Sequence, residues 1–172
     1  MRNKTQFKIV HTPPAYFYSG KYFNSPRDIK PYSYMIFSCC KKDYSFAGAT
    51  GGTAFRIVLD NAADYSFSLV SNGWEAQGLH THYWAISIWQ GWSCPYVGPF
   101  TAGVAASANA EDGYNSAGST GVFLRSTEEF SGLDENGKEK KFHFEFSASP
   151  SYYMATYTIS QVFSKWDSRI NR

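Results

Sequence analysis

Two histidines separated by a single residue, His80 and His82, are the clearest candidates for chemistry in this sequence of 172 residues. In a β-strand, residues i and i+2 point to the same face, so both imidazoles could approach one metal ion. Protein metal sites usually have three or four ligands, and the sequence does not place the other histidines, His11 and His143, beside this pair. Two interpretations stay open: a metal site at His80 and His82, or two structural histidines near the end of a strand.

The same two histidines belong to the segment Gly78-Leu79-His80-Thr81-His82, which resembles the G-x-H-x-H element of tailed-phage tail fibres. In that family three chains wind around one axis, and each chain contributes two histidines to one octahedral metal ion. The resemblance implies a metal ion at His80 and His82 and a place for this chain in a virion.

Signatures of catalysis are otherwise scarce. Cys94 could pair its thiol with one of the histidines, but it lies in an apolar, Trp-rich stretch that favours a buried thiol. The acidic pairs at 128–129 and 134–135 cannot flank one glycosidic bond, because adjacent residues of a strand point to opposite faces. The sequence contains no Gly-x-Ser-x-Gly, His-Glu-x-x-His, phosphate-binding loop or Cys-x-x-Cys. We therefore expect no enzymatic activity, and no cofactor besides a metal ion at the two histidines.

The composition is rich in aromatic residues: 14 Phe, 13 Tyr and 5 Trp make up 19% of the chain, whereas charged residues make up only 17%. Each aromatic side chain has about 150–250 Å² to bury, which is difficult for all of them in one small core. Tyr and Trp are also favoured at protein interfaces. The net charge of +2 is too small to indicate a nucleic-acid partner, and no segment has the length of a membrane span. The composition favours a protein that assembles with other copies or other virion proteins, or that binds a surface.

The N-terminus and the cysteines indicate the compartment. Residues 1–10 alternate polar and apolar side chains and lack the apolar run of a signal peptide. Cys39, Cys40 and Cys94 are odd in number and two of them are adjacent, unlike a disulfide framework. We expect synthesis in the cytoplasm, idle reduced thiols and later incorporation into a virion.

The first 31 residues are predicted to form an extended N-terminal arm, because four prolines interrupt them. The arm would lie on its own domain or on a neighbouring subunit, and a chain lacking it would stay folded but lose its oligomeric state. Its aromatic residues are the candidate contacts: Tyr16, Phe17, Tyr18, Tyr22 and Phe23.

Residues 32–172 are predicted to form a single β-rich domain, an antiparallel β-sandwich or a jelly-roll-like fold. Alternation of apolar residues predicts strands at 32–36, 55–59, 65–69, 82–90, 142–146 and 153–159. The clearest is the run Phe142, Phe144 and Phe146, which follows a tight turn predicted at Asn136-Gly137.

Two segments depart from this strand pattern. Small and polar residues predict a long loop over 101–121, a candidate for binding or assembly. Val162, Phe163, Trp166 and Ile170 recur at helical spacing, which predicts a short C-terminal helix with an apolar stripe.

These observations favour a non-enzymatic structural subunit of a symmetric assembly, such as a phage tail, fibre or capsid-surface protein. Contacts would come from the arm, from the 101–121 loop, and from Phe163 and Trp166. The alternative is a lectin-like carbohydrate-binding or receptor-binding module, in which Trp89, Trp92 and Tyr96 stack against the faces of sugar rings.

Overall fold

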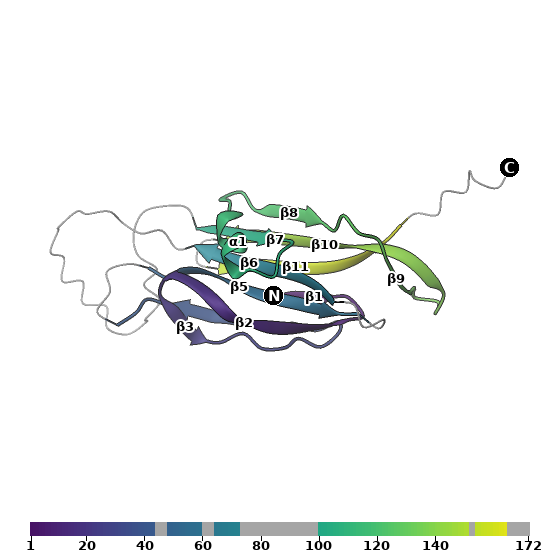
Figure 1. Ribbon diagram of the computed structural model, residues 1–172, viewed down its shortest axis with the longest axis horizontal. Coiled ribbons are helices and arrows are strands. Elements are labelled where there is room, and N and C mark those ends of the chain that lie inside the picture. The colour runs from purple at the N-terminus through teal and green to yellow at the C-terminus, as the bar shows by residue number, and fades with distance from the viewer. Residues whose placement is uncertain (44–47, 60–63, 73–99, 152–153, 165–172) are drawn as a thin grey trace.

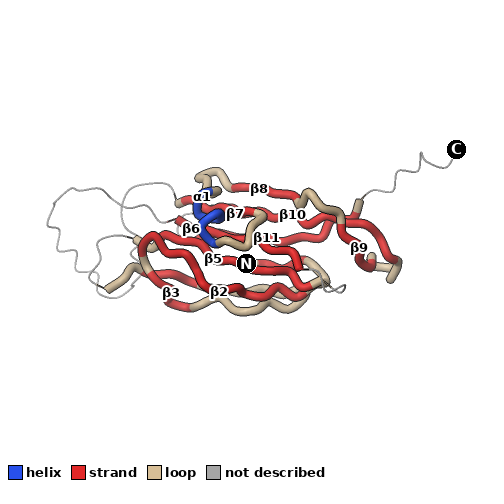
Figure 2. The backbone as a smooth tube through the Cα atoms, viewed as in Figure 1, coloured by secondary structure: helices blue, strands red, loops and turns tan. Residues whose placement is uncertain are grey.

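The described residues are mostly β-strand, which confirms the prediction of a β-rich fold (Figure 1, Figure 2). The computed structural model describes residues 1–43, 48–59, 64–72, 100–151 and 154–164. These residues form two larger sheets, a two-stranded sheet and one short helix. Within the described residues no helix has the length and apolarity needed to cross a membrane.

The first sheet is centred on two long antiparallel strands, β10 (Glu139–Ser151) and β11 (Met154–Phe163). β1 (Arg2–Lys4) runs parallel to β11 along one edge. On the other side of β10, β8 (Val122–Arg125) and β9 (Phe130–Leu133) pair with successive parts of that strand.

The second sheet is antiparallel throughout, in the order β2-β5-β6-β7. Its strands are β2 (Lys8–Ser19), β5 (Thr50–Val58), β6 (Asp64–Asn72) and β7 (Thr101–Ala105). A separate two-stranded sheet consists of β3 (Lys21–Asn24) and β4 (Ser38–Cys40).

One aromatic core lies between the two larger sheets. Phe142, Phe144 and Phe146 are the inward residues of β10 and are buried, so the prediction of a strand with this alternation is confirmed. From the second sheet Phe67 meets Phe146 with ring centroids 4.9 Å apart, and it stacks on Phe55 at 5.7 Å. Because both sheets contribute to this core, neither is expected to be stable alone.

The turn before β10 explains the register of the β9–β10 hairpin. The Asp134 amide donates to the Lys138 carbonyl at 2.8 Å, and the Gly137 amide donates back to the Asp134 carbonyl at 2.9 Å. Gly137 has φ of +73°, a value that glycine adopts without strain. The predicted tight turn is therefore present, and it places Leu133 opposite Glu139.

Residues 1–31, predicted as an arm, are extended and belong to both larger sheets. They supply β1, β2 and β3, and their side chains Phe7, Ile9 and Ile29 are buried in the shared core. Ile9 and Ile29 also exchange backbone hydrogen bonds of 2.9 and 2.8 Å. The segment therefore contributes to the folding of its own domain.

The predicted C-terminal helix is wrong for the residues that the structure describes. Val162 and Phe163 belong to β11, opposite His143 and Phe142 of β10. The spacing of these two positions is compatible with a helical stripe and with a strand. Pairing with the 13-residue strand β10 stabilises the strand. The remaining residues of the stripe, Trp166 and Ile170, lie outside the described residues.

The predicted loop over 101–121 instead contains β7 and the helix α1 (Ala110–Asn115). Asn109 caps the helix, since its side chain accepts a hydrogen bond from the Glu111 amide at 3.2 Å. The small residues allow close packing on the second sheet: a Cβ at Gly113 would lie 2.9 Å from the Ser68 hydroxyl. The small residues allow a helix to pack closely on a sheet. The same small and polar residues are also typical of loops, so the sequence alone did not predict the helix.

Candidate functional site

An exposed row of large apolar side chains follows the first sheet along its β1 edge. Tyr32, Tyr34 and Ile36, here called the apolar row, are 71%, 73% and 75% exposed. Met35, between them, is buried. The strand predicted over 32–36 is not formed, because Tyr32 lies in a turn with φ of +51° and only an isolated bridge joins Tyr34 to β1. The three apolar side chains nevertheless face solvent.

The backbone of the apolar row forms an open sheet edge. The Asn3 amide donates to the Ser33 carbonyl at 2.8 Å, and the Met35 amide donates to the Met1 carbonyl at 2.9 Å. In this antiparallel pattern the amide and carbonyl of Tyr34 point away from β1. Within the described part of the chain they have no hydrogen-bond partner. A further strand could therefore hydrogen-bond at Tyr34, whereas the Ile36 carbonyl already accepts from the Asn24 side chain and the Tyr32 amide donates to the Thr5 carbonyl.

A polar cluster under β1 holds this edge in place. The Asn3 side-chain amide donates to the carbonyls of Phe7 at 2.8 Å and Lys30 at 3.0 Å. Its oxygen accepts from the Thr5 amide at 3.0 Å and from the Thr5 hydroxyl at 2.8 Å. Asn3 and Thr5 are both buried, so these hydrogen bonds replace those that water would otherwise make.

A groove of about 750 Å³ lies next to the apolar row, between this edge and β11. Its wall is mainly apolar and includes Met1, Ile36, Phe37, Met154 and Tyr157. Met154 is itself exposed. The groove and the apolar row together form one continuous surface that another molecule could cover.

A second exposed aromatic surface joins β2 to α1. This surface, here called the tyrosine cluster, consists of Tyr16, Tyr18 and Tyr114. The ring centroid of Tyr114 lies 5.5 Å from that of Tyr16 and 6.1 Å from that of Tyr18. Partial burial raises the pKa of Tyr16, and the nearby Glu111 carboxylate adds to the effect. The sequence indicated Tyr16 and Tyr18 but missed Tyr114, which lies in the segment predicted as a loop.

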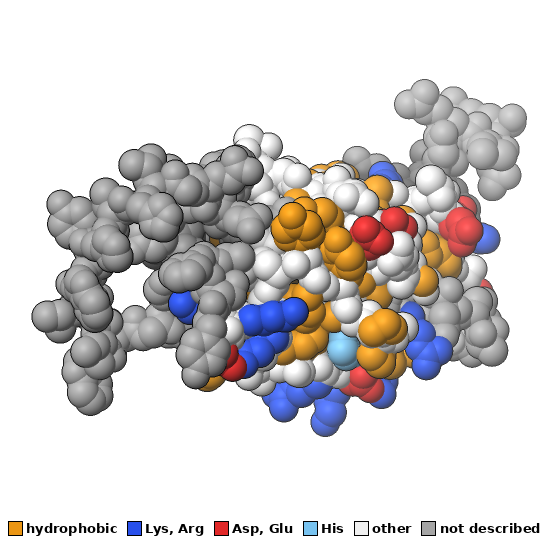
Figure 3. All heavy atoms as spheres, turned by 60° about the vertical axis from the view of Figure 1, so that its left-hand side comes forward, with side chains coloured by type: hydrophobic (Ala, Val, Ile, Leu, Met, Phe, Trp, Pro, Cys, Tyr) orange, Lys and Arg blue, Asp and Glu red, His pale blue; other side chains and the backbone are white. Residues whose placement is uncertain are grey.

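The other aromatic residues predicted in the arm differ in their surroundings. Phe17 and Tyr22 are half-buried against each other, with ring centroids 4.9 Å apart, and burial raises the pKa of Tyr22 to about 12. Phe23 is exposed. Phe163 is half-buried at the end of β11, 6.0 Å from the ring of Phe142. The face drawn in Figure 3 shows that exposed hydrophobic side chains occur in patches, with basic side chains along the lower edge.

The cysteines that the structure describes have the character of idle thiols. Cys39 and Cys40 are free, and burial raises the pKa of Cys39 to about 12. Cys39 therefore keeps its proton at neutral pH, and a protonated thiol is a poor nucleophile.

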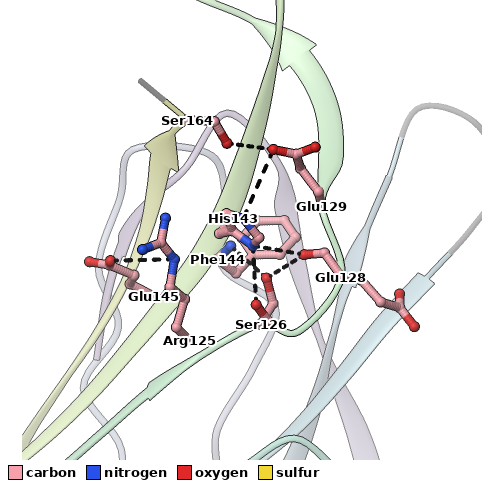
Figure 4. Close-up of polar contacts among 8 residues, drawn as sticks. All are labelled: Arg125, Ser126, Glu128, Glu129, His143, Phe144, Glu145 and Ser164. Carbon is pink, nitrogen blue, oxygen red and sulfur yellow. Dashed lines mark hydrogen bonds and ion pairs between the residues drawn. The ribbon is translucent and has the colours of Figure 1, made fainter. Parts of the chain in front are cut away.

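A histidine-centred cluster ties the β8–β9 connection to β10 (Figure 4). The His143 Nδ1 lies 3.1 Å from the carbonyls of both Ser126 and Glu128, so this nitrogen must carry the proton and donate it. Its Nε2 faces the Glu129 carboxylate at 4.0 Å, and Ser164 donates to that carboxylate at 2.6 Å. The Ser164 hydroxyl thus contacts a carboxylate and not the imidazole, which is not the arrangement of an activated serine nucleophile. We interpret the cluster as a structural tie.

Several predicted site residues lie outside the described residues: His80, His82, Trp89, Trp92, Tyr96 and Trp166, together with Cys94. Among the residues that are described, no group of three His, Cys, Asp or Glu side chains is placed to hold a metal ion.

Comparison with protein-family models and with curated proteins finds no match to this chain.

Proposed function

We propose that this protein is a non-enzymatic structural subunit of a symmetric assembly, in which the apolar row pairs with the same row of a second copy. The observation that carries the proposal is the exposure of three large apolar side chains, each above 70%, beside a sheet edge where the amide and carbonyl of Tyr34 are unpaired within the described residues. Monomeric proteins usually protect such edges with charges, prolines or bulges, since an exposed apolar edge invites pairing.

The geometry of the edge favours a second copy as the partner. Antiparallel pairing centred on Tyr34 would bring Tyr32 of one copy near Ile36 of the other about a two-fold axis. Its backbone hydrogen bonds would be those of Tyr34, because the Tyr32 amide donates to the Thr5 carbonyl at 3.2 Å and the Ile36 carbonyl accepts from the Asn24 side chain at 3.3 Å. The exposed Tyr34 and Ile36 are two residues apart in extended backbone, and the exposed Tyr32 precedes them in a turn, so pairing of two such edges would bring apolar side chains of both copies together. The adjacent groove would be partly covered by the same contact.

The virion setting rests on the Gly78-to-His82 segment, which resembles the histidine element of phage tail fibres. In this part of the proposal, the imidazoles of His80 and His82 are ligands of a metal ion that several chains share. A phage tail, fibre or capsid-surface protein would use such a symmetric contact to build a particle. We also interpret the two larger sheets with their shared core as an antiparallel β-sandwich.

The test is the mass of the protein in solution, measured by light scattering during size-exclusion chromatography. We expect the wild-type chain to form an oligomer, and the variant with Tyr32→Ser, Tyr34→Ser and Ile36→Ser to be a folded monomer. The matched control replaces Phe123 of β8 and Leu133 of β9 by Ser. These side chains are 64% and 56% exposed, and their strands lie at the edge of the same sheet that is farthest from β1. The control should keep the wild-type mass.

The stoichiometry distinguishes the modes of assembly. A mass of two chains, lost in the triple variant, supports pairing through the apolar row. A trimer with about one metal ion per three chains, unchanged in the triple variant, supports the fibre-like arrangement and overturns the edge pairing. A monomeric wild type at all concentrations overturns self-assembly.

A further inference from the structure

The tyrosine cluster has features of a binding site that the proposed assembly does not use. Tyr18 is 61% exposed, and its ring lies nearly parallel to that of Tyr114, with an interplanar angle of 16°. Tyr16 borders Tyr114 at an angle of 56°. One exposed ring, Tyr18, therefore lies against two half-buried rings, Tyr16 and Tyr114, at one place on the surface.

The position of this cluster is fixed by close packing beneath it. Gly52 of β5 lies against the carbonyl of Ala110, where a Cβ atom would collide with the backbone of α1. Gly113 also packs closely, since a Cβ there would lie 2.9 Å from the Ser68 hydroxyl of β6. Since α1 is held this closely on the second sheet, Tyr114 is fixed next to the two tyrosines of β2. A site whose rings are held in advance loses little conformational entropy when a ligand binds.

The helix that carries Tyr114 also has exposed polar side chains. Glu111, Asp112 and Asn115 are exposed on this helix. The effect of Glu111 on the pKa of Tyr16 indicates that its negative charge lies near the phenol group. Carboxylates and amides exchange hydrogen bonds with hydroxyl groups, and carboxylates repel anionic ligands.

We propose that Tyr16, Tyr18 and Tyr114 form a binding site for neutral oligosaccharides. The apolar face of a pyranose ring stacks on the exposed face of Tyr18, and its hydroxyl groups hydrogen-bond to the phenols and to Glu111. The negative charge on α1 disfavours sialylated and sulfated glycans. This site is distinct from the tryptophans at 89 and 92, and it does not depend on pairing through the apolar row.

The test is binding of the full-length protein to an array of neutral, sialylated and sulfated oligosaccharides, followed by titration with the neutral oligosaccharide that binds best. Loss of one stacked aromatic ring is expected to weaken binding about tenfold in Tyr18→Ala. Tyr18→Phe keeps the ring and should retain most of the affinity. Tyr32→Ala is the matched control, because it removes another exposed tyrosine, 71% exposed, from the apolar row. It should bind like the wild type.

A second variant tests the charge argument. Glu111→Gln keeps a hydrogen-bonding side chain but removes the charge, so it should increase binding of sialylated oligosaccharides relative to neutral ones. Absence of binding to every neutral oligosaccharide on the array would overturn the proposal. Neutral-glycan binding that is unchanged in both Tyr18→Ala and Tyr114→Ala would also overturn it, since other rings would then hold the sugar.

Discussion

The buried phenylalanines of β10 and the apolar row have the same sequence pattern and opposite surroundings. Phe142, Phe144 and Phe146 face the second sheet and are almost inaccessible, whereas Tyr32, Tyr34 and Ile36 project into solvent. In both cases every second side chain is large and apolar. The difference comes from position: β10 lies in the middle of its sheet, and the apolar row follows an edge. Alternation thus sets which side chains share a face, while the neighbouring elements decide whether that face is covered.

The largest effect is expected from removing residues 1–31. This deletion would take away β1 and β2 as well as the core residues Phe7, Ile9 and Ile29. We expect the remaining chain to lose cooperative unfolding, measured by circular dichroism during heating, and not merely its oligomeric state. A truncated chain that still unfolds in a sharp transition would show that these residues act as an arm.

The next comparison replaces one of the buried phenylalanines of β10 and one residue of the apolar row. Phe144→Ala should lower the free energy of unfolding by about 3–5 kcal/mol, because it leaves a cavity in the shared core. Tyr34→Ala should change the free energy of unfolding of the monomer by less than about 0.5 kcal/mol, as is usual for exposed positions. Denaturant unfolding of both variants, with the exposed Phe123→Ala as a control, measures the contrast. Equal losses at positions 144 and 34 would contradict it.

Asn3→Ala tests how the edge beside the apolar row is held. Asn3 is buried, and its loss would leave the Lys30 carbonyl without this donor and the Phe7 carbonyl with only the longer hydrogen bond of 3.3 Å from the Thr5 hydroxyl. Each unsatisfied buried group costs about 1–3 kcal/mol, so we expect a loss of about 2–4 kcal/mol in the free energy of unfolding. Asn24→Ala is the control, since Asn24 is exposed and makes one hydrogen bond of 3.3 Å to Ile36. Similar values for the two variants would mean that the cluster does not stabilise the edge.

The smallest effect concerns Asp134 in the turn that sets the register of β10. Hydrogen bonds from Lys140 and from the amides of Lys138 and Asn136 lower the pKa of Asp134 to about 2. Because this value is lower than in the unfolded chain, the carboxylate stabilises the folded state above about pH 4. That stabilisation is lost as the pH falls towards 2.

Asp134→Asn keeps the acceptor oxygen and removes the charge. The difference in free energy of unfolding between this variant and the wild type should be constant above pH 5 and shrink between pH 4 and pH 2. Glu135→Gln, which removes the charge of the exposed neighbouring carboxylate in the same turn, is the control. A difference for Asp134→Asn that is independent of pH would contradict the role of the charge.

Local patterns predicted the parts of the fold that depend on neighbours in sequence. The Phe142-to-Phe146 strand and the turn at Gly137 follow from alternation and from glycine at a positive φ. Val162 and Phe163 fitted two periodicities, and only pairing with β10 decides between them. The six-residue helix α1 is too short for a periodic signal, so Tyr114 could not be found.

The candidate surfaces were predicted less completely, because exposure depends on contacts between distant segments. Tyr16 and Tyr18 were indicated by their residue type alone, whereas Phe17 and Tyr22 of the same segment pack against each other. The apolar row was assigned to a strand without any indication that it faces solvent. That fact depends on the placement of β1 beside residues 33–35, more than 25 positions later in the chain.

The central claim is that the apolar row is the edge through which two copies pair. Hydrogen–deuterium exchange at the amide of Tyr34, measured above and below the concentration at which the protein assembles, tests this claim most directly. We expect slow exchange in the assembled wild-type protein, and fast exchange on dilution and in the Tyr32→Ser, Tyr34→Ser, Ile36→Ser variant. An assembled protein in which this amide still exchanges as fast as in the monomer would contradict the claim.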